Sequence, residues 1–254
     1  MARKTRLLVA GTLGVTLMGQ PATSAELKVL TTGAFKQVVV ALIPEFEKTT
    51  GHKVVLDNGT VGQLTKRVDQ GESFDVLVLS PKGLEEQVAK GKVVGGSIAN
   101  LAKVGVGVMV KAGAPKPDIS TVDAFKQALL SAKSVGYIDP ASGGSSGIYV
   151  ASLLEKLGIA EQIKPKAKLQ QGGHVSDLVK SGQAEIGIHQ NSEIVGQAGV
   201  DLVGPLPAPI QNYTTYAIGL GSGAQHTEEA KAFIRLLTGP LAASVLKSRG
   251  MEGL

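Results

Sequence analysis

The stretch YIDPASGGSSGIYVASLLEKLG, Tyr137–Gly158, joins an apolar strand to a helix through a loop of glycine and serine. Glycine-rich turns of this kind often cradle phosphate. This one lacks the Gly-Lys-Ser/Thr ending of a phosphate loop and does not spell G-x-G-x-x-G. It therefore predicts a strand–loop–helix unit whose loop could hold an anion, but not a nucleotide-binding loop.

The same alternation extends along the chain and predicts an α/β fold of parallel strand–helix–strand units. Strands are expected at 27–32, 52–57, 74–80, 101–113, 134–140, 184–190, 201–207 and 212–221. Helices are expected at 35–48, 61–70, 83–90, 122–132, 148–157, from 175, at 227–238 and at 241–248. The lysine-spaced stretch IKPKAKLQ (163–170) is assigned to no element.

Two long strands, 101–112 and 212–221, bracket a self-contained middle section. This arrangement indicates a chain that crosses to a second lobe and returns. We expect lobe 1 to comprise 26–106 and 216–254, and lobe 2 to comprise 107–215. Ligands of such proteins bind in the cleft, at the carboxyl ends of parallel strands.

Residues 1–25 have the pattern of a secretory signal peptide. Arg3, Lys4 and Arg6 precede an apolar run from Leu7 to Met18, and small residues end the segment. The run is shorter than the roughly 20 residues of a membrane span. We expect cleavage, a periplasmic protein and no remaining membrane span; an uncleaved anchor is the alternative.

Charge and composition exclude several classes of partner. The chain has 26 Lys+Arg and 21 Asp+Glu, and residues 1–25 hold three of the basic residues, so the mature net charge is 23 − 21 = +2. With no basic run and no Trp, nucleic acid is not an expected partner. The absence of Cys and the scattering of four His exclude a structural zinc site. A monomer is expected.

Four glycine-bearing loops each follow a strand and open a helix. They are TTGAFK (31–36), DNGTVGQL (57–64), PASGGSSG (140–147) and QGGHVSD (171–177). Free N–H groups and the positive end of the helix dipole meet at such points, so several loops in one cleft would bind a small anion. Ordinary helix caps and turns are the alternative. The predicted ligand-binding residues in these loops are Thr32, Gly33, Ala34, Lys36, Gly59, Thr60, Val61, Ser142, Gly144, Ser145, Ser146 and Gly173.

The order of the motifs resembles the periplasmic molybdate-binding proteins, the solute receptors of ABC importers. The likeness lies in LTTGAF, NGTVGQLTKRVDQGESFDVLVLS, IDPASGGSSGIYVASLLEKLG, SGQAEIGIHQNSEI, the late GLGS strand and the closing GPLAASVLKSRGM. The resemblance implies a type II periplasmic-binding-protein fold, with two α/β lobes of mixed, mostly parallel sheets joined by two hinge strands.

The ligand residues of that family carry over poorly. Ala34 stands where the family has a serine, and Gly59-Thr60-Val61-Gly62 replaces a serine-rich run. Ser146 could match a backbone donor of the third loop, and Gln190 replaces a tyrosine. The resemblance therefore implies a retained scaffold and a different ligand.

Groups that can move protons stand near the predicted cleft. His174 lies in the fourth loop, His189 ends a strand, and Tyr213 lies on the returning strand; these three are the candidate acids and bases. Gln190, Tyr216 and Lys36 are further candidates for contact with the ligand. The alternatives are a packed histidine at a strand end, a solvated Lys36 and a core Tyr216.

These features also resemble a subgroup, the periplasmic aconitate isomerase type. That resemblance implies interconversion of trans- and cis-aconitate, a small tricarboxylate, by an allylic 1,3-proton shift without metal or organic cofactor. The alternative is a soluble substrate-binding protein for a small carboxylate or a molybdate-like oxyanion, with an ABC permease as its partner. A metal-ion receptor is disfavoured because the sequence has no His/Asp/Glu cluster.

Overall fold

The computed structural model describes residues 24–254, so the predicted signal peptide lies outside the described residues as far as residue 23. The strands are β1 (Glu26–Thr32), β2 (Lys53–Gly59), β3 (Val76–Leu79), β4 (Ala99–Lys111), β5 (Val135–Ile138), β6 (Ala167–Gln170), β7 (Ile186–Gln190), β8 (Val200–Pro205), β9 (Tyr213–Leu220) and β10 (Glu252–Gly253).

The α-helices are α1 (Gly33–Thr50), α2 (Val61–Asp69), α3 (Pro81–Ala89), α4 (Val122–Ser131), α5 (Ser145–Lys156), α6 (Ala160–Ile163), α7 (Val175–Lys180), α8 (Thr227–Leu237) and α9 (Pro240–Ser248). Short 3₁₀ turns are η1 (Pro140–Ser142), η2 (Lys164–Lys166), η3 (Asn191–Glu193) and η4 (Ala208–Ile210). No helix within residues 24–254 combines the length and apolar character needed to cross a membrane.

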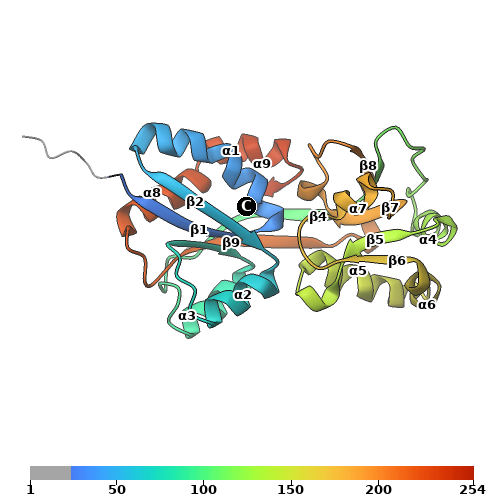
Figure 1. Cartoon of the computed structure of the whole chain (residues 1–254), viewed down its shortest axis with the longest axis horizontal. Coiled ribbons are helices and arrows are strands. Elements are labelled where there is room, and N and C mark those ends of the chain that lie inside the picture. The colour runs from blue at the N-terminus through green and yellow to red at the C-terminus, as the bar shows by residue number, and fades with distance from the viewer. Residues whose placement is uncertain (1–23) are drawn as a thin grey trace, which may run out of the picture.

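The strands follow the order β2-β1-β3-β9-β4-β7-β5-β6. Pairing is parallel on both flanks, in β2-β1-β3 and in β7-β5-β6, and antiparallel where β9 and β4 join them. The first half of β4 pairs with β9, while its second half pairs with β7 and β8. β4 and β9 therefore run between two halves of the molecule, as Figure 1 shows. The predicted mixed α/β fold is confirmed.

The hydrophobic core is divided in the same way. In one half, α1, α8 and α9 cover one face of the strands while α2 and α3 cover the other (Figure 1). In the other half, α4, α5 and α6 lie opposite α7. Along β4 the core changes between Val104 and Val106. The lobe bounds of 26–106 with 216–254, and 107–215, stay a prediction.

Two segments differ from the sequence prediction. The stretch 163–170 forms η2 and then β6, an edge strand parallel to β5. None of its side chains is buried, so the apolar pattern of a buried strand is missing. Helix α5 begins at Ser145 rather than Ile148, because the two serines take up the first turn of the helix and shorten the loop.

Candidate active site

Starts of helices from both halves meet at one cleft. Its walls include Gly33 and Ala34 at the start of α1, Val61 at the start of α2, and residues at the starts of α5 and α7. The sequence-predicted residues on the wall are Thr32, Gly33, Ala34, Gly59, Thr60, Val61, Gly144, Ser145, Ser146, Gly173, His174, His189, Gln190 and Tyr216.

The helix starts differ in how their first N–H groups are used. Thr60 caps α2 through a reciprocal pair of hydrogen bonds with Gln63. By contrast, α1 and α5 begin at Thr32 and Gly144 without a side-chain cap. The first N–H groups of α1 and α5 therefore have no side-chain acceptor, and an anion in the cleft could take that place.

A carboxylate lies between the two histidines of the cleft. Oε2 of Glu193 is 3.0 Å from Nδ1 of His189, and Oε1 is 3.8 Å from Nδ1 of His174. The side chains of His189 and Glu193 are 3% and 7% exposed, whereas that of His174 is 24% exposed. The His189 contact is close but is not aligned as a hydrogen bond, since neither ring nitrogen of His189 has a hydrogen-bond partner.

Tyr216 closes the inner wall of the cleft. Its hydroxyl donates to Oε1 of Gln190 at 2.8 Å, joining β9 to β7. Burial raises the pKa of the Tyr216 phenol far above its ordinary value, and the negative charge of Glu193 adds to the effect. The phenol is therefore a neutral donor over the whole physiological pH range.

Several polar atoms of this wall are buried without a partner. They are Oγ1 of Thr32, Nδ1 of His174, Nδ1 and Nε2 of His189, and Nε2 of Gln190. Buried polar groups in native proteins are nearly always hydrogen-bonded, so a group of unpaired ones needs an explanation. A polar ligand in the cleft would supply the missing partners.

The cleft is closed at its rim by contacts between the halves. The N–H of Gly62 donates to the carbonyl of Gly143 at 3.2 Å, and the hydroxyl of Thr60 donates to the carbonyl of Ser142. A Cβ on Gly62 would stand 2.9 Å from Cα of Gly143. Glycine at 62 thus permits two backbones to touch across the rim.

Three predicted residues lie off the cleft wall. Tyr213 is 51% exposed, and its ring lies under the ammonium group of Lys103 at 5.0 Å. Lys36 is half-buried on α1, one turn past the cleft. The Ser142 hydroxyl turns back to the carbonyl of Asp139. This placement removes Tyr213 from the candidate acids and bases. On β9, Tyr213 is exposed to solvent, whereas Tyr216 is buried and lines the cleft.

Sequence reasoning missed Glu193, Asn58 and Ile138, which also line the cleft. Glu193 was visible as an acid four residues after His189 in HQNSE. Its significance depends on η3, which turns the chain after β7 so that Glu193 faces His189 and His174.

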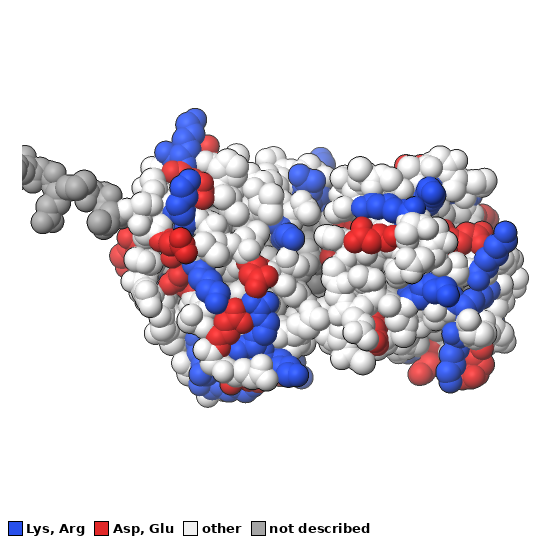
Figure 2. Space-filling view, viewed as in Figure 1, with Lys and Arg blue, Asp and Glu red and all other residues white. Residues whose placement is uncertain are grey.

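Charges are distributed differently inside and outside the cleft. No Lys or Arg belongs to its wall in the part of the chain that the structure describes. On the outside, basic and acidic side chains intermingle without an extended patch of one sign on the face shown in Figure 2. Selectivity for an anion would therefore come from N–H groups and histidines rather than from fixed cations.

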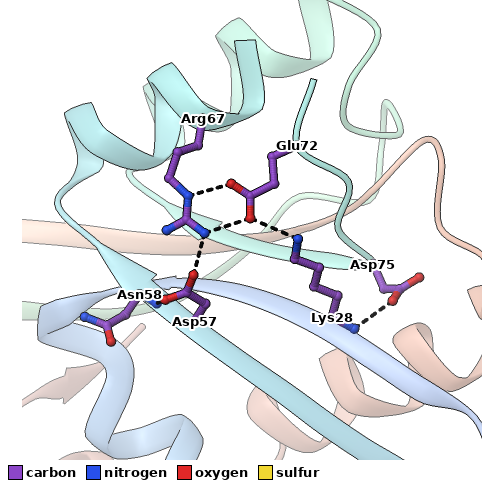
Figure 3. A network of polar contacts seen from close by, with 6 residues as sticks. All are labelled: Lys28, Asp57, Asn58, Arg67, Glu72 and Asp75. Atoms are coloured by element: carbon purple, nitrogen blue, oxygen red, sulfur yellow. Dashed lines mark hydrogen bonds and ion pairs between the residues drawn. The ribbon is translucent and has the colours of Figure 1, made fainter. Parts of the chain in front are cut away.

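An ion-pair network joins α2 to β1 and β2 (Figure 3). Arg67 on α2 contacts Glu72 and, at the end of β2, Asp57; Glu72 also pairs with the ammonium group of Lys28 on β1 at 2.9 Å. Asp75 accepts the backbone N–H of Lys28 at 2.8 Å. The network fixes α2 against β1 and β2, next to Asn58 on the cleft wall.

Nowhere in residues 24–254 do three His, Cys, Asp or Glu side chains form a group able to hold a metal ion.

Comparison with known proteins points to solute binding. Residues 27–252 match the family described as bacterial extracellular solute-binding protein.

Two relatives cover nearly the whole chain. The aconitate isomerase of a Pseudomonas species is 33% identical over 242 residues, 93% of this chain and 90% of that protein. The molybdate-binding protein ModA of Azotobacter vinelandii is 29% identical over 256 residues, 96% of each.

Among solved structures, the periplasmic molybdate-binding protein of Azotobacter vinelandii matches with a TM-score of 0.74 and 21% identity. The match covers 89% of this chain and 98% of that one. It confirms the predicted fold, and the relatives confirm the predicted resemblance.

Proposed function

The chain belongs to the bacterial extracellular solute-binding protein family, and on this premise we propose that it is a periplasmic isomerase that interconverts trans- and cis-aconitate. The proposal includes no metal or organic cofactor, because histidines can transfer the proton and N–H groups can stabilise the charge that develops. The 33% identity to an aconitate isomerase over 93% of the chain supports it. The group of buried, unpartnered polar atoms at two histidines is the observation that carries it.

The helix starts would hold the substrate. The uncapped N–H groups at the starts of α1 and α5 can donate hydrogen bonds to carboxylate oxygens, as can the hydroxyls of Thr32 and Ser145. Helix dipoles favour negative charge at these points. With carboxylates held in this way, the carbon chain of a tricarboxylate lies toward the histidines.

The reaction needs one proton taken and one returned. Nε2 of His189 removes a proton from the carbon beside a carboxylate; the C–H electron pair passes into the dienolate and the double bond shifts. A proton then forms a new C–H bond at the far end of the allylic system. The N–H donors that hold the carboxylate also stabilise the charge that develops on it.

Turnover of the purified mature protein tests the proposal. Trans-aconitate is incubated in deuterated water and the cis isomer is followed by proton NMR; we expect turnover that is lost, by about 100-fold or more, in His189→Ala. His226→Ala is a matched control because His226 lies at the start of α8, off the cleft wall. Wild-type protein without turnover contradicts the proposal.

The second candidate is the soluble receptor of an ABC importer for a small carboxylate or an oxyanion. The likeness to ModA and the family match favour it. Saturable binding of molybdate or of an aconitate, with no isomerisation of either aconitate, would select this candidate.

A further inference from the structure

We propose that Glu193 is a positioning residue that links His189 and His174 into one proton-transfer pair. The inference rests on the proposed isomerase function and names how the site returns to its starting protonation state after each turnover.

Both oxygens of one carboxylate are used. Oε2 faces Nδ1 of His189 at 3.0 Å and Oε1 faces Nδ1 of His174 at 3.8 Å. The two histidines come from different elements, the end of β7 and the residue before α7, and η3 places the carboxylate between them. A carboxylate that served only to anchor one histidine would leave its second oxygen facing other groups.

The surroundings leave Glu193 few other partners. Around it on the cleft wall are the start of α1 at Gly33, the hydroxyl of Tyr216 on β9, and Gln190 on β7. A Cβ on Gly33 would stand 2.8 Å from Oε1 of Glu193, so the helix start is packed against the carboxylate. In the described part of the chain, the titratable groups on this wall are the two histidines, Glu193 and Tyr216, with no Lys or Arg.

The short contact between Oε2 of Glu193 and Nδ1 of His189 favours Nε2 as the reacting nitrogen once the two groups align. When Nδ1–H of His189 points to the carboxylate, Nε2 keeps its lone pair and can act as the base. The imidazolium formed by proton abstraction is then stabilised by Glu193, as in other histidine–carboxylate pairs.

The second histidine closes the proton balance. In a turnover where His189 takes a proton and His174 Nε2–H donates one, His189 ends with one proton more and His174 with one fewer. His174 starts doubly protonated and ends neutral, while Glu193 stays ionised and faces the protonated ring throughout, first His174 and then His189, so the net charge of the three groups is unchanged. After the product leaves, Nε2–H of His189 gives its proton to water in the cleft and Nε2 of His174 takes one from water, which restores the starting state. No oxidant or further reactant is needed. The 24% exposure of the His174 side chain also lets this end exchange protons with water.

Glu193→Gln tests the link, with Glu155→Gln on the exposed side of α5 as the matched control. We expect Glu193→Gln to lower kcat by about 100-fold with KM changed less than about 3-fold, since substrate contacts remain. Glu155→Gln should keep wild-type kinetics. A kcat for Glu193→Gln within about 2-fold of wild type overturns the inference while leaving the isomerase proposal in place.

A second readout does not depend on turnover. In ¹⁵N-labelled protein, the ring-nitrogen chemical shifts of His174 and His189 are recorded by NMR; Glu193→Gln should change those of both rings, because each loses the carboxylate oxygen that faces its Nδ1. A change in only one histidine, or in neither, overturns the link even if the protein proves to be a receptor. If Glu193→Gln does not fold, His189→Gln in the same experiment should change the ring-nitrogen chemical shifts of His174, which then has the carboxylate to itself.

Discussion

The lack of a side chain at Gly33 leaves room for the carboxylate of Glu193. The space that a Cβ would occupy at this position is taken by Oε1 of Glu193, 2.8 Å away. The φ angle of Gly33 is not positive, so other residues could adopt its backbone conformation. The glycine is therefore required by packing against the Glu193 carboxylate rather than by the turn itself.

Gly33→Ala should separate activity from stability. Alanine in a helix is favoured over glycine by about 0.5–1 kcal/mol, so the melting temperature should stay level or rise. The displaced carboxylate should lower kcat by about 10-fold. Gly223→Ala is the control, because a Cβ there meets nothing within 4 Å. Unchanged kcat in Gly33→Ala, with thermal melts as the check on folding, would contradict the packing argument.

Tyr216→Phe should cost stability without moving the alkaline limb of the pH profile. The loss of the hydroxyl leaves Oε1 of Gln190 buried and unpaired, at about 1–3 kcal/mol. Because burial keeps the pKa of Tyr216 well above 10, its phenol does not titrate between pH 7 and about 10. Denaturation and kcat/KM against pH would check both parts; an alkaline limb that disappears in the variant would show that the phenol does ionise.

Among single residues, the sequence could predict the site residues whose side chains are themselves titratable. The two histidines and Tyr216 could be proposed from their titratable groups, and they lie on the cleft wall. Glu193 could not be proposed in this way, since its position depends on a 3₁₀ turn that the spacing of apolar residues does not predict. Tyr213 was misplaced because two tyrosines three residues apart on one strand cannot be assigned to a face until the pairing is known.

Among the elements, α2 is held by charges as well as by its apolar face. Ion pairing with Arg67, and then with Lys28, lowers the pKa of Glu72 from about 4.5 to about 2. A lowered folded-state pKa contributes stability that is present above pH 4.5 and is lost as pH falls toward 2. The network therefore makes the lobe that carries α2 sensitive to acid (Figure 3).

Glu72→Gln should remove that part of the pH dependence. At pH 7 the variant should be less stable by about 1 kcal/mol, the size expected for a partly exposed network. The difference should shrink below pH 4.5 and disappear as pH falls through about 2, because the wild-type carboxyl is then protonated. Urea denaturation at a series of pH values gives the curves; a constant difference down to pH 2 would argue against a charge-based contribution.

Most helices and strands could be predicted from the spacing of their apolar residues, since buried strands and amphipathic helices differ in that spacing. β6 could not, because an edge strand with exposed side chains carries no apolar signal. Nor could the start of α5, where serine and glycine suit a loop and a first helical turn equally well.

For the whole molecule, the rim contact is the feature that joins the halves around the ligand site. Gly62→Ala places a Cβ 2.9 Å from Cα of Gly143 and 3.2 Å from the carbonyl of Ser142, both of them backbone atoms that cannot rotate away. We expect a weaker affinity for trans-aconitate by about 10-fold, or ~1.4 kcal/mol. Calorimetry measures the affinity, and small-angle scattering should show a larger radius of gyration. Unaltered affinity would mean that the rim contact plays no part in binding.

The two-lobed plan was accessible from sequence because two long strands bracket the middle section, and β4 and β9 are those strands. The convergence of loops from 31–36, 57–64, 140–147 and 171–177 on one cleft was a hypothesis that only the sheet order could place in space.

Backbone NMR of the ¹⁵N-labelled protein titrated with trans-aconitate tests most directly whether main-chain amides from both halves hold a small polycarboxylate. The amides of Gly33, Ala34, Ser145 and Ser146 should shift together at one saturating concentration, with those of β6 and α8 unmoved. Shifts confined to one half, or centred away from these helix starts, would contradict it.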